Sequence, residues 1–297
     1  MDRDTFIITV FSLVSEMYPP VTAQRPVRHG GCAPAWSDEE VITSEICGAY
    51  FKLHTDRDLY EYFAAHYRHF FPRLPNRSLC VRQAANLWQV KTAIWQLLVE
   101  RSGQSTSPVQ VIDTRPLPVS TYTGAQRDRS FTTLADYGHC AAKKLDDYGF
   151  KLGLRVSAMG MMTHFPLLSA RAHDVNHTNA LVEGFAGLCP ADKGFIEPFR
   201  LPLLQDRYGV TIVTPAKSNM SQAHPPALLK CCRRIRKIVE TVGWHLTERF
   251  GVDALRVHDL WHFQQRLIRK VLAHTVLVFL NLQLGRDPLD LDGLVTA

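Results

Sequence analysis

Three acidic residues, Asp113, Asp192 and Glu240, have a placement that favours metal-assisted chemistry. Asp113 ends the apolar run VQVID, Asp192 follows the apolar run GLCPA, and Glu240 lies inside a helical pattern. Two carboxylates about 4 Å apart repel each other by about 4 kcal/mol at an effective dielectric of 20, so a cluster of three needs a cation. Carboxylate oxygens suit Mg²⁺, and Mn²⁺ has similar preferences. Two such ions can activate a water or a 3′-hydroxyl and stabilise the leaving oxygen of a phosphodiester.

Each of these acids also has a simpler interpretation. Asp113 can cap the turn that follows its strand, and Asp192 can be a turn residue before Lys193 and Gly194. Glu240 can be an ordinary charge on a solvated helix face. Placement along the chain alone leaves both interpretations open for all three residues.

The basic residues before Glu240 have the same two interpretations. In CCRRIRKIVETVGWHL, Arg233, Arg236 and Lys237 precede the glutamate and Trp244 follows it. On a helix, Arg236 and Lys237 share the face of Glu240, where such pairs add a few tenths of a kcal/mol. If Glu240 instead holds a metal, these cations and Lys193 would meet a phosphate bound there.

A second group of cations lies in a polar stretch from 115 to 147 that shows no clear periodicity. Cations supply phosphate contacts, and the aromatic residues among them can stack on unpaired bases. The stretch therefore predicts a DNA contact, with a variable loop as the alternative. The cations proposed to contact DNA are Arg127, Arg129, Lys143 and Lys144.

The segment RAHDVNHT offers a further polar cluster of His173, Asp174 and His177. The simplest interpretation of Asp174 is a helix cap, since Asp is a favoured N-cap residue. The segment also borders a predicted strand end, where it can contact DNA or orient a ligand.

The elements that position these residues change character near residue 101. Residues 1–100 have helical patterns, with a capping box predicted at Ser37 and Glu40. Residues 101–285 alternate strands with helices and predict an α/β domain with a mixed sheet, and 286–297 form a tail. We therefore expect an all-helical N-terminal region followed by a catalytic domain.

The composition favours a globular protein with a polyanionic partner. The chain has 297 residues, 46% hydrophobic and 21% charged, and a formal charge of +6. Residues 1–100 hold 10 Lys and Arg against 11 Asp and Glu, so the basic excess lies wholly after residue 100. Nucleic acid is the partner that such an excess permits.

No compositional feature predicts a membrane segment, a disulfide framework or a small-molecule cofactor. Seven scattered cysteines without a C-x-x-C pair indicate reduced thiols in a cytoplasm. The N-terminal run FIITVFSLV lacks a basic flank and a cleavage site, so an amphipathic helix is predicted rather than a leader. The run VLAHTVLVFLNLQL is too short to span a bilayer, and no glycine-rich phosphate loop occurs.

Several motifs occur in an order that resembles the DDE transposases of bacterial insertion sequences, most closely the insertion sequence 982 family. The first acid of that family lies in an ID(S/T) strand, which corresponds here to Asp113, and the second lies in (G/A)DKG, here Asp192. The third lies in an (I/V)ET helix, here Glu240, and the acids are 79 and 48 residues apart. The resemblance runs from about Trp36 to Leu280 through VIDTRPLPV, YGFKLGLRVSAMG, PLLSARAHDVNHTNAL, ADKGFI, YGVTIVTPAKSNM and RRIRKIVETVGWHL.

The resemblance implies a ribonuclease-H-like catalytic core that cuts and joins double-stranded DNA with two Mg²⁺ ions per active site. The helical region would bind the terminal inverted repeats, and the freed 3′-hydroxyl would attack target DNA. Two ends must be joined together, so a homodimer or a larger synaptic complex is expected. The expected location is the bacterial cytoplasm, at the nucleoid when the protein acts.

One departure from the family concerns a phosphate-binding lysine seven positions after the glutamate. This chain has Thr247 there, with His245 and Arg249 as cations that can replace the lysine, and Arg233 stands where the family often has tyrosine. Two alternative functions therefore stay open. One is a metal-dependent nuclease without strand transfer, and the other is an inactive, element-derived DNA-binding protein.

Overall fold

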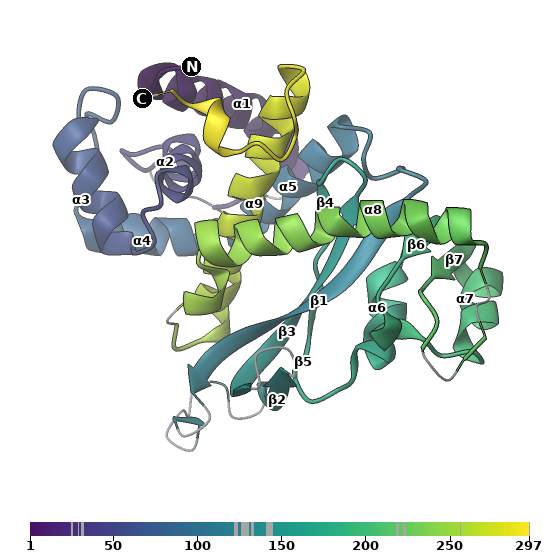
Figure 1. Ribbon diagram of the computed structural model, residues 1–297. Helices are drawn as coiled ribbons and strands as arrows, with labels where there is room; N and C mark the ends of the chain where they lie inside the picture. Colours follow the sequence, from purple (N-terminus) through teal and green to yellow (C-terminus); the bar gives the residue numbers. More distant parts are fainter. Residues whose placement is uncertain are drawn as a thin grey trace. The chain divides into compact units, whose positions relative to one another are not determined.

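The computed structural model forms two compact units. We call residues 1–101 with 245–297 the helical unit, and residues 102–244 the sheet unit. Figure 1 shows both units. The structure describes residues 1–296 except for 25, 29, 31–32, 122–123, 126–130, 132–133, 141–144, 218–219, 222–223 and 256.

The sequence predicts boundaries near residue 100 and at 285, and the compact units divide after residues 101 and 244. The long C-terminal helix α9 (Leu260–Gln283) is buried along most of its length and packs against α2, α4 and α5 of the helical unit. Its apolar surface needs those helices as cover, so the sequence-based extension of the catalytic domain to 285 is wrong as a packing boundary.

The helical unit begins with helices that follow their sequence signals. Ser37 caps α2, and both hydrogen bonds of the predicted capping box with Glu40 are present. Asn76 accepts from the backbone N–H of Leu79 and so caps α4. The helices and short helical turns of this unit are α1 (Arg3–Gln24), α2 (Asp38–Tyr50), α3 (Asp56–His66), α4 (Arg77–Asn86), α5 (Trp88–Arg101), η4 (His245–Arg249), η5 (Val252–Ala254), α9 and η6 (Asp292–Leu294).

Among the described residues, α1 is long and apolar enough to cross a membrane by length and composition. It packs against α2 and α5. Phe6, Val10 and Met17 on its inner face are fully buried. A helix that buries one face against its neighbours acts as part of the core, as the predicted amphipathic helix does.

The long strand β3 (Leu145–Ser157) is the centre of the sheet unit. The strand β1 (Gln110–Thr121) pairs with one edge of β3 in antiparallel direction. Three short strands pair with the other edge on successive stretches: β2 (Asp136–Cys140), β5 (Leu167–Ser169) and β4 (Met162–His164). A turn at Gly160, with φ +81°, lets the chain reverse after β3, where a turn was predicted.

A parallel pair extends the sheet beyond β1. The strands β6 (Gly187–Pro190) and β7 (Val210–Val213) run parallel, and a parallel bridge joins Val109 to Leu188. The α/β class predicted from the alternation of strands and helices is therefore confirmed, with both strand directions present.

The position of Asp113 in its strand differs from the prediction. The apolar run ends at Asp113, yet β1 continues to Thr121, so part of the polar stretch from 115 to 147 is strand. Pro116 and Pro118 lie two residues apart, which places both nitrogens on the same side of the strand. The alternate N–H groups can still bond β3, so pairing overrides the polar composition.

The helices of the sheet unit cover both faces of its strands. Cys232, Val239, Val242 and Gly243 recur at helical spacing on α8 (Pro226–Trp244) and are buried. The helix packs against β1, β3 and β6, as Figure 1 shows. The remaining elements are η2 (Asp174–His177), α6 (Thr178–Val182), η3 (Lys193–Phe195) and α7 (Arg200–Tyr208). The apolar core here comprises Ile112, Leu181, Val182, Phe185, Cys189, Ala191, Phe195, Leu204, Val210 and Ile212.

Candidate active site

The parallel bridge between β1 and β6 explains why the first two acids lie at one level. Val109 pairs with Leu188, and Asp113 and Asp192 each follow their bridge residue by four positions. Parallel strands advance by about 3.3 Å per residue, so equal offsets end at the same height. Asp192 then stands just beyond β6, at the N-cap position of η3.

The face of β1 that carries Asp113 is turned toward α8. Side chains alternate along a strand, so Asp113 and Arg115 share one face. Arg115 Nε lies 3.4 Å from Asp113 Oδ2. A Cβ added at Gly243 of α8 would lie 2.5 Å from Arg115 Nε, so the absence of a side chain there leaves room for the guanidinium.

The helix α8 carries the third acid, Glu240, and also Arg236, which contacts two of the acids. The guanidinium of Arg236 lies 3.3 Å from Asp192 Oδ1 and 3.8 Å from Glu240 Oε1. Arg236 precedes Glu240 by one helical turn, which is the spacing at which helical side chains meet. One guanidinium therefore connects two of the acids, and it also stabilises the ionised form of Asp113.

Asp113 is the least solvated of the three acids. Its side chain is 28% exposed, against 56% for Asp192 and 58% for Glu240. Burial raises the pKa of Asp113 to about 6, although Arg115, the Thr114 N–H and Arg236 lower it. The negative charge of this carboxylate is therefore the one that gains most from a nearby cation.

Metal binding would require a rearrangement of these contacts. Within the described part of the chain, no group of three or more His, Cys, Asp or Glu side chains is arranged to hold a metal ion. Asp113, Asp192 and Glu240 contact guanidinium groups instead. Three carboxylates nevertheless form the donor set that Mg²⁺ and Mn²⁺ prefer, so the chemistry of the residues fits such an ion.

Asp174 is a fourth acid at this site, and its predicted role as a helix cap is wrong. Its side chain accepts from Thr114 Oγ1 at 2.7 Å and from Lys151 Nζ at 3.0 Å. The N-cap of η2 is instead His173, without a side-chain cap bond. The charge of Asp174 also raises the pKa of Asp113. Lys151 had no sequence signal, because it meets Asp174 only through the fold.

The cations predicted to contact DNA fall into three groups. Arg233 and Lys237 are exposed on α8, which carries Glu240, and Lys193 is exposed on η3, directly after Asp192. Arg236 is partly buried because it pairs with the acids. Arg127, Arg129, Lys143 and Lys144 lie outside the described residues.

The two cations suggested as replacements for the missing lysine are buried in the helical unit. His245 and Arg249 are each 5% exposed. Burial lowers the pKa of His245 to about 4, so its ring is neutral near pH 7. Arg249 pairs with Asp292. The sequence-based suggestion that either residue replaces the lysine is therefore wrong.

Comparison with known families identifies the class of protein. A family described as Transposase DDE domain matches residues 102–258, which cover more than half of the chain and include all three acids. The chain belongs to the DDE transposase family. The match begins at the first residue of the sheet unit. The chemistry of this transposase is therefore DNA recombination.

Two further comparisons add little to this assignment. The curated proteins contain no match to the chain. A cryo-EM structure of the piggyBac transposase synaptic complex with hairpin DNA aligns with 12% identity and a TM-score of 0.42. That alignment covers 100% of this chain and 86% of the other. A likeness at this TM-score supports no conclusion about this transposase.

Proposed function

We propose that this transposase belongs to an insertion sequence, similar to the 982 family, and cuts DNA at the terminal inverted repeats. The freed 3′-hydroxyl then attacks a phosphodiester of target DNA. Asp113, Asp192 and Glu240 would together hold two Mg²⁺ or Mn²⁺ ions. The observation that carries this proposal is the contact of Arg236 with Asp192 and Glu240, from two elements 48 residues apart.

The chain's own residues would bind and orient the DNA. When bound, the ions supply Lewis-acid stabilisation of the phosphate and lower the pKa of the attacking hydroxyl. A cation held there would favour the ionised form of Asp113, whose carboxyl has a pKa of about 6. Arg236, released from the acids, would join Lys237 in holding phosphate oxygens. No side chain of the protein needs to act as a nucleophile.

The strand order supports a ribonuclease-H-like core. The strands β3 and β1 are antiparallel, β6 follows beside β1 in parallel, and β7 lies next to β6. The acids lie on β1, directly after β6 and on α8, which packs against these strands. We further propose that the helical unit binds the repeats, that a homodimer or larger complex joins the two ends, and that the protein acts at the bacterial nucleoid.

A second candidate is an inactive, element-derived DNA-binding protein. It is favoured by the separation of the acids by arginines and by the burial of His245 and Arg249. A third candidate, a nuclease that cuts without joining, uses the same acids. These functions differ in whether DNA is cut and in whether the cut end is transferred.

Nicking of supercoiled plasmid by the purified protein tests the proposal. We expect nicking in Mg²⁺ or Mn²⁺, no nicking in Ca²⁺, and none with Asp192→Asn. Asp206→Asn, an exposed acid of α7, is the matched control and should nick as wild type does. A labelled inverted-repeat end with a free 3′-hydroxyl then tests whether strands are joined.

Metal binding distinguishes the candidates when nicking fails. Mn²⁺ titration followed by electron paramagnetic resonance should show binding to wild type that Asp192→Asn weakens. A folded wild-type protein that neither nicks nor binds Mn²⁺ would contradict the proposed site. Nicking without transfer of the labelled end would instead support the nuclease.

A further inference from the structure

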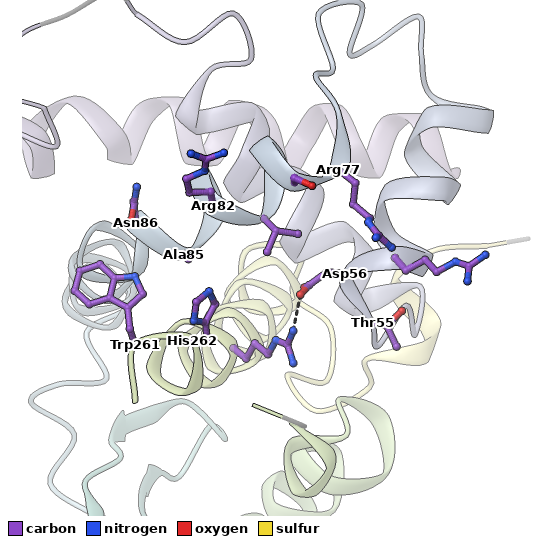
Figure 2. Close-up of a pocket in the computed structure, with 12 residues that line it drawn as sticks. Thr55, Asp56, Arg77, Arg82, Ala85, Asn86, Trp261 and His262 are labelled. Atoms are coloured by element: carbon purple, nitrogen blue, oxygen red, sulfur yellow. Dashed lines mark hydrogen bonds and ion pairs between the residues drawn. The ribbon is translucent and has the colours of Figure 1, made fainter. Parts of the chain in front are cut away.

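The helical unit contains a pocket with an unusual concentration of arginine. Its volume is about 730 Å³, and its lining includes Arg57, Arg77, Arg82 and Arg266. Trp261 and His262 also line it, and Asp56 is the one acid among its lining residues. Figure 2 shows the residues of this pocket, which the acids of the sheet unit do not line.

Two of the four arginines in this pocket are available to a ligand, since Arg57 pairs with Glu61 and Arg266 pairs with Asp56. Asp56 is already neutralised, because it lies 2.6 Å from Arg266 and 2.8 Å from Arg269. Arg77 and Arg82 are exposed and form no ion pair with any residue in the described part of the chain. An anion that enters the pocket would therefore find two guanidinium groups without a competing carboxylate.

The helix α4 explains how its cations reach one side of the pocket. Ser78, Arg82 and Asn86 follow each other at four-residue spacing, so they share one face, and Arg77 begins the helix. Figure 2 shows Arg77 and Arg82 on one side of the pocket and His262 on the other. These residues form a row of donors that faces an open space.

The aromatic residue of the pocket is both fixed and accessible. Trp261 belongs to the first turn of α9 and packs edge-on against Trp88, with ring centroids 5.7 Å apart. Its side chain nevertheless stays 45% exposed. One pocket that holds an exposed indole and two unpaired guanidinium groups matches the way proteins hold nucleic acid strands, with bases on aromatic rings and phosphates on cations.

We propose that this pocket binds a DNA strand, with backbone phosphates on Arg77 and Arg82 and an unpaired base against Trp261. The proposal rests on the proposed function only in taking DNA as the ligand. The volume lies in the range of pockets that hold a small organic group, which suits a single nucleotide. The helical unit would thus bind a DNA strand independently of Asp113, Asp192 and Glu240.

Fluorescence anisotropy of the full chain with labelled single-stranded and duplex oligonucleotides, without divalent metal, tests the pocket. We expect Arg77→Gln with Arg82→Gln to weaken binding of the single strand at least about tenfold and to reduce its salt slope by about 1.4. Trp261→Ala should weaken it by about 5- to 100-fold, and Trp261→Phe should retain most of the affinity. Arg68→Gln with Arg73→Gln, two exposed arginines outside the pocket, is the matched control.

Equal binding of the single strand by the Arg77/Arg82 variant and its control would overturn the proposal. Thermal unfolding of each variant checks that it is folded. If Trp261→Ala does not fold, single-strand binding by the Arg77/Arg82 variant and by Trp261→Phe still tests the proposal. Asp206→Asn, an exposed acid of α7 outside both proposed sites, should bind the single strand as wild type does. If the pocket variants bind normally while Asp192→Asn abolishes nicking, the pocket fails and the proposed function stands. If the pocket variants lose binding and wild type never nicks DNA, the pocket proposal stands and the proposed function fails.

Discussion

The two units of this transposase pair carboxylates with cations in different ways. In the helical unit, Lys91 Nζ lies 2.6 Å from Glu45 Oε2, and neither side chain is more than 4% exposed. In the sheet unit, Arg236 lies 3.3 Å from Asp192 and 3.8 Å from Glu240, and both acids are more than half exposed. The carboxylate of Glu45 is therefore paired in a buried site, whereas those of Asp192 and Glu240 are paired in contact with solvent.

The buried network of the helical unit is satisfied by additional hydrogen bonds. Gln265 Nε2 donates to Glu45 Oε1 at 2.5 Å, and Lys91 also donates to the carbonyl of Ala84 at 2.9 Å. Arg269 lies 3.7 Å from Glu45 and 2.8 Å from Asp56. Such a network costs much to break, because removing one partner leaves a buried charge uncompensated.

The contacts among the acids of the sheet unit are weak by comparison. Exposed ion pairs contribute about 0–1 kcal/mol, since water and salt compensate for their loss. Asp192 and Glu240 can therefore exchange the guanidinium for another cation at little cost in stability. The contrast indicates that the buried pair has a structural role, whereas the exposed acids are free to serve a ligand.

The largest expected effect is on activity. Glu240→Gln should reduce plasmid nicking by at least about a thousandfold, because metal-ion catalysis supplies several kcal/mol of transition-state stabilisation. Urea unfolding of the same variant should change by no more than about 0.5 kcal/mol, since the side chain is largely exposed. A substantial loss of stability would instead show that Glu240 holds the fold.

The next effect is on stability. Lys91→Met should lower the free energy of unfolding by about 3 kcal/mol, because it leaves Glu45 buried with weaker compensation. Arg57→Met removes a cation from the exposed pair with Glu61 and should cost less than about 0.5 kcal/mol. Urea unfolding followed by circular dichroism measures both. Equal values for the two variants would remove the distinction between buried and exposed pairs.

A smaller effect is expected beside the acids. Asp174→Ala removes the acceptor of Thr114 and one of two acceptors of Lys151, which still donates to the carbonyl of Ala172. Nicking should fall by about tenfold, as for groups that orient metal ligands. Unchanged nicking in Asp174→Ala would show that this fourth acid does not assist the site.

A last effect concerns the pH dependence of stability. Burial lowers the pKa of Lys270 to about 7, with Arg269 and Arg266 adding to the shift. Between about pH 7 and 10 the unfolded state binds more protons at this lysine, so stability should rise with pH by up to about 1.4 kcal/mol per unit. Lys270→Met should remove this slope, measured as the difference from wild type in urea unfolding. Parallel curves for the two proteins would contradict the shift.

The predicted elements were most accurate where the signal was local. The capping box at Ser37 and Glu40 and the cap at Asn76 are each contained within four residues. The strand after Asp113 was missed, because composition shows polar residues and prolines there while pairing with β3 supplies the hydrogen bonds. The packing boundary at 285 failed because the cover of α9 comes from helices far earlier in the chain.

For the candidate site too, local features were predicted from the sequence and long-range contacts were not. The types and order of Asp113, Asp192 and Glu240 are legible in the sequence, and so is the spacing of Arg236 from Glu240. The pairing of Asp174 with Lys151 and Thr114 could not be predicted from the sequence, because those residues lie 23 and 60 positions away.

The amino-acid sequence alone therefore determined which chemical groups this transposase carries and which short segments become helices or strands. Only the tertiary structure decided which charges are buried, which stay accessible and which partners they meet. The physical reason is the distance along the chain over which each effect acts. Propensity, capping and periodicity act over a few residues, whereas burial and ion pairing depend on strand register and helix packing between distant segments.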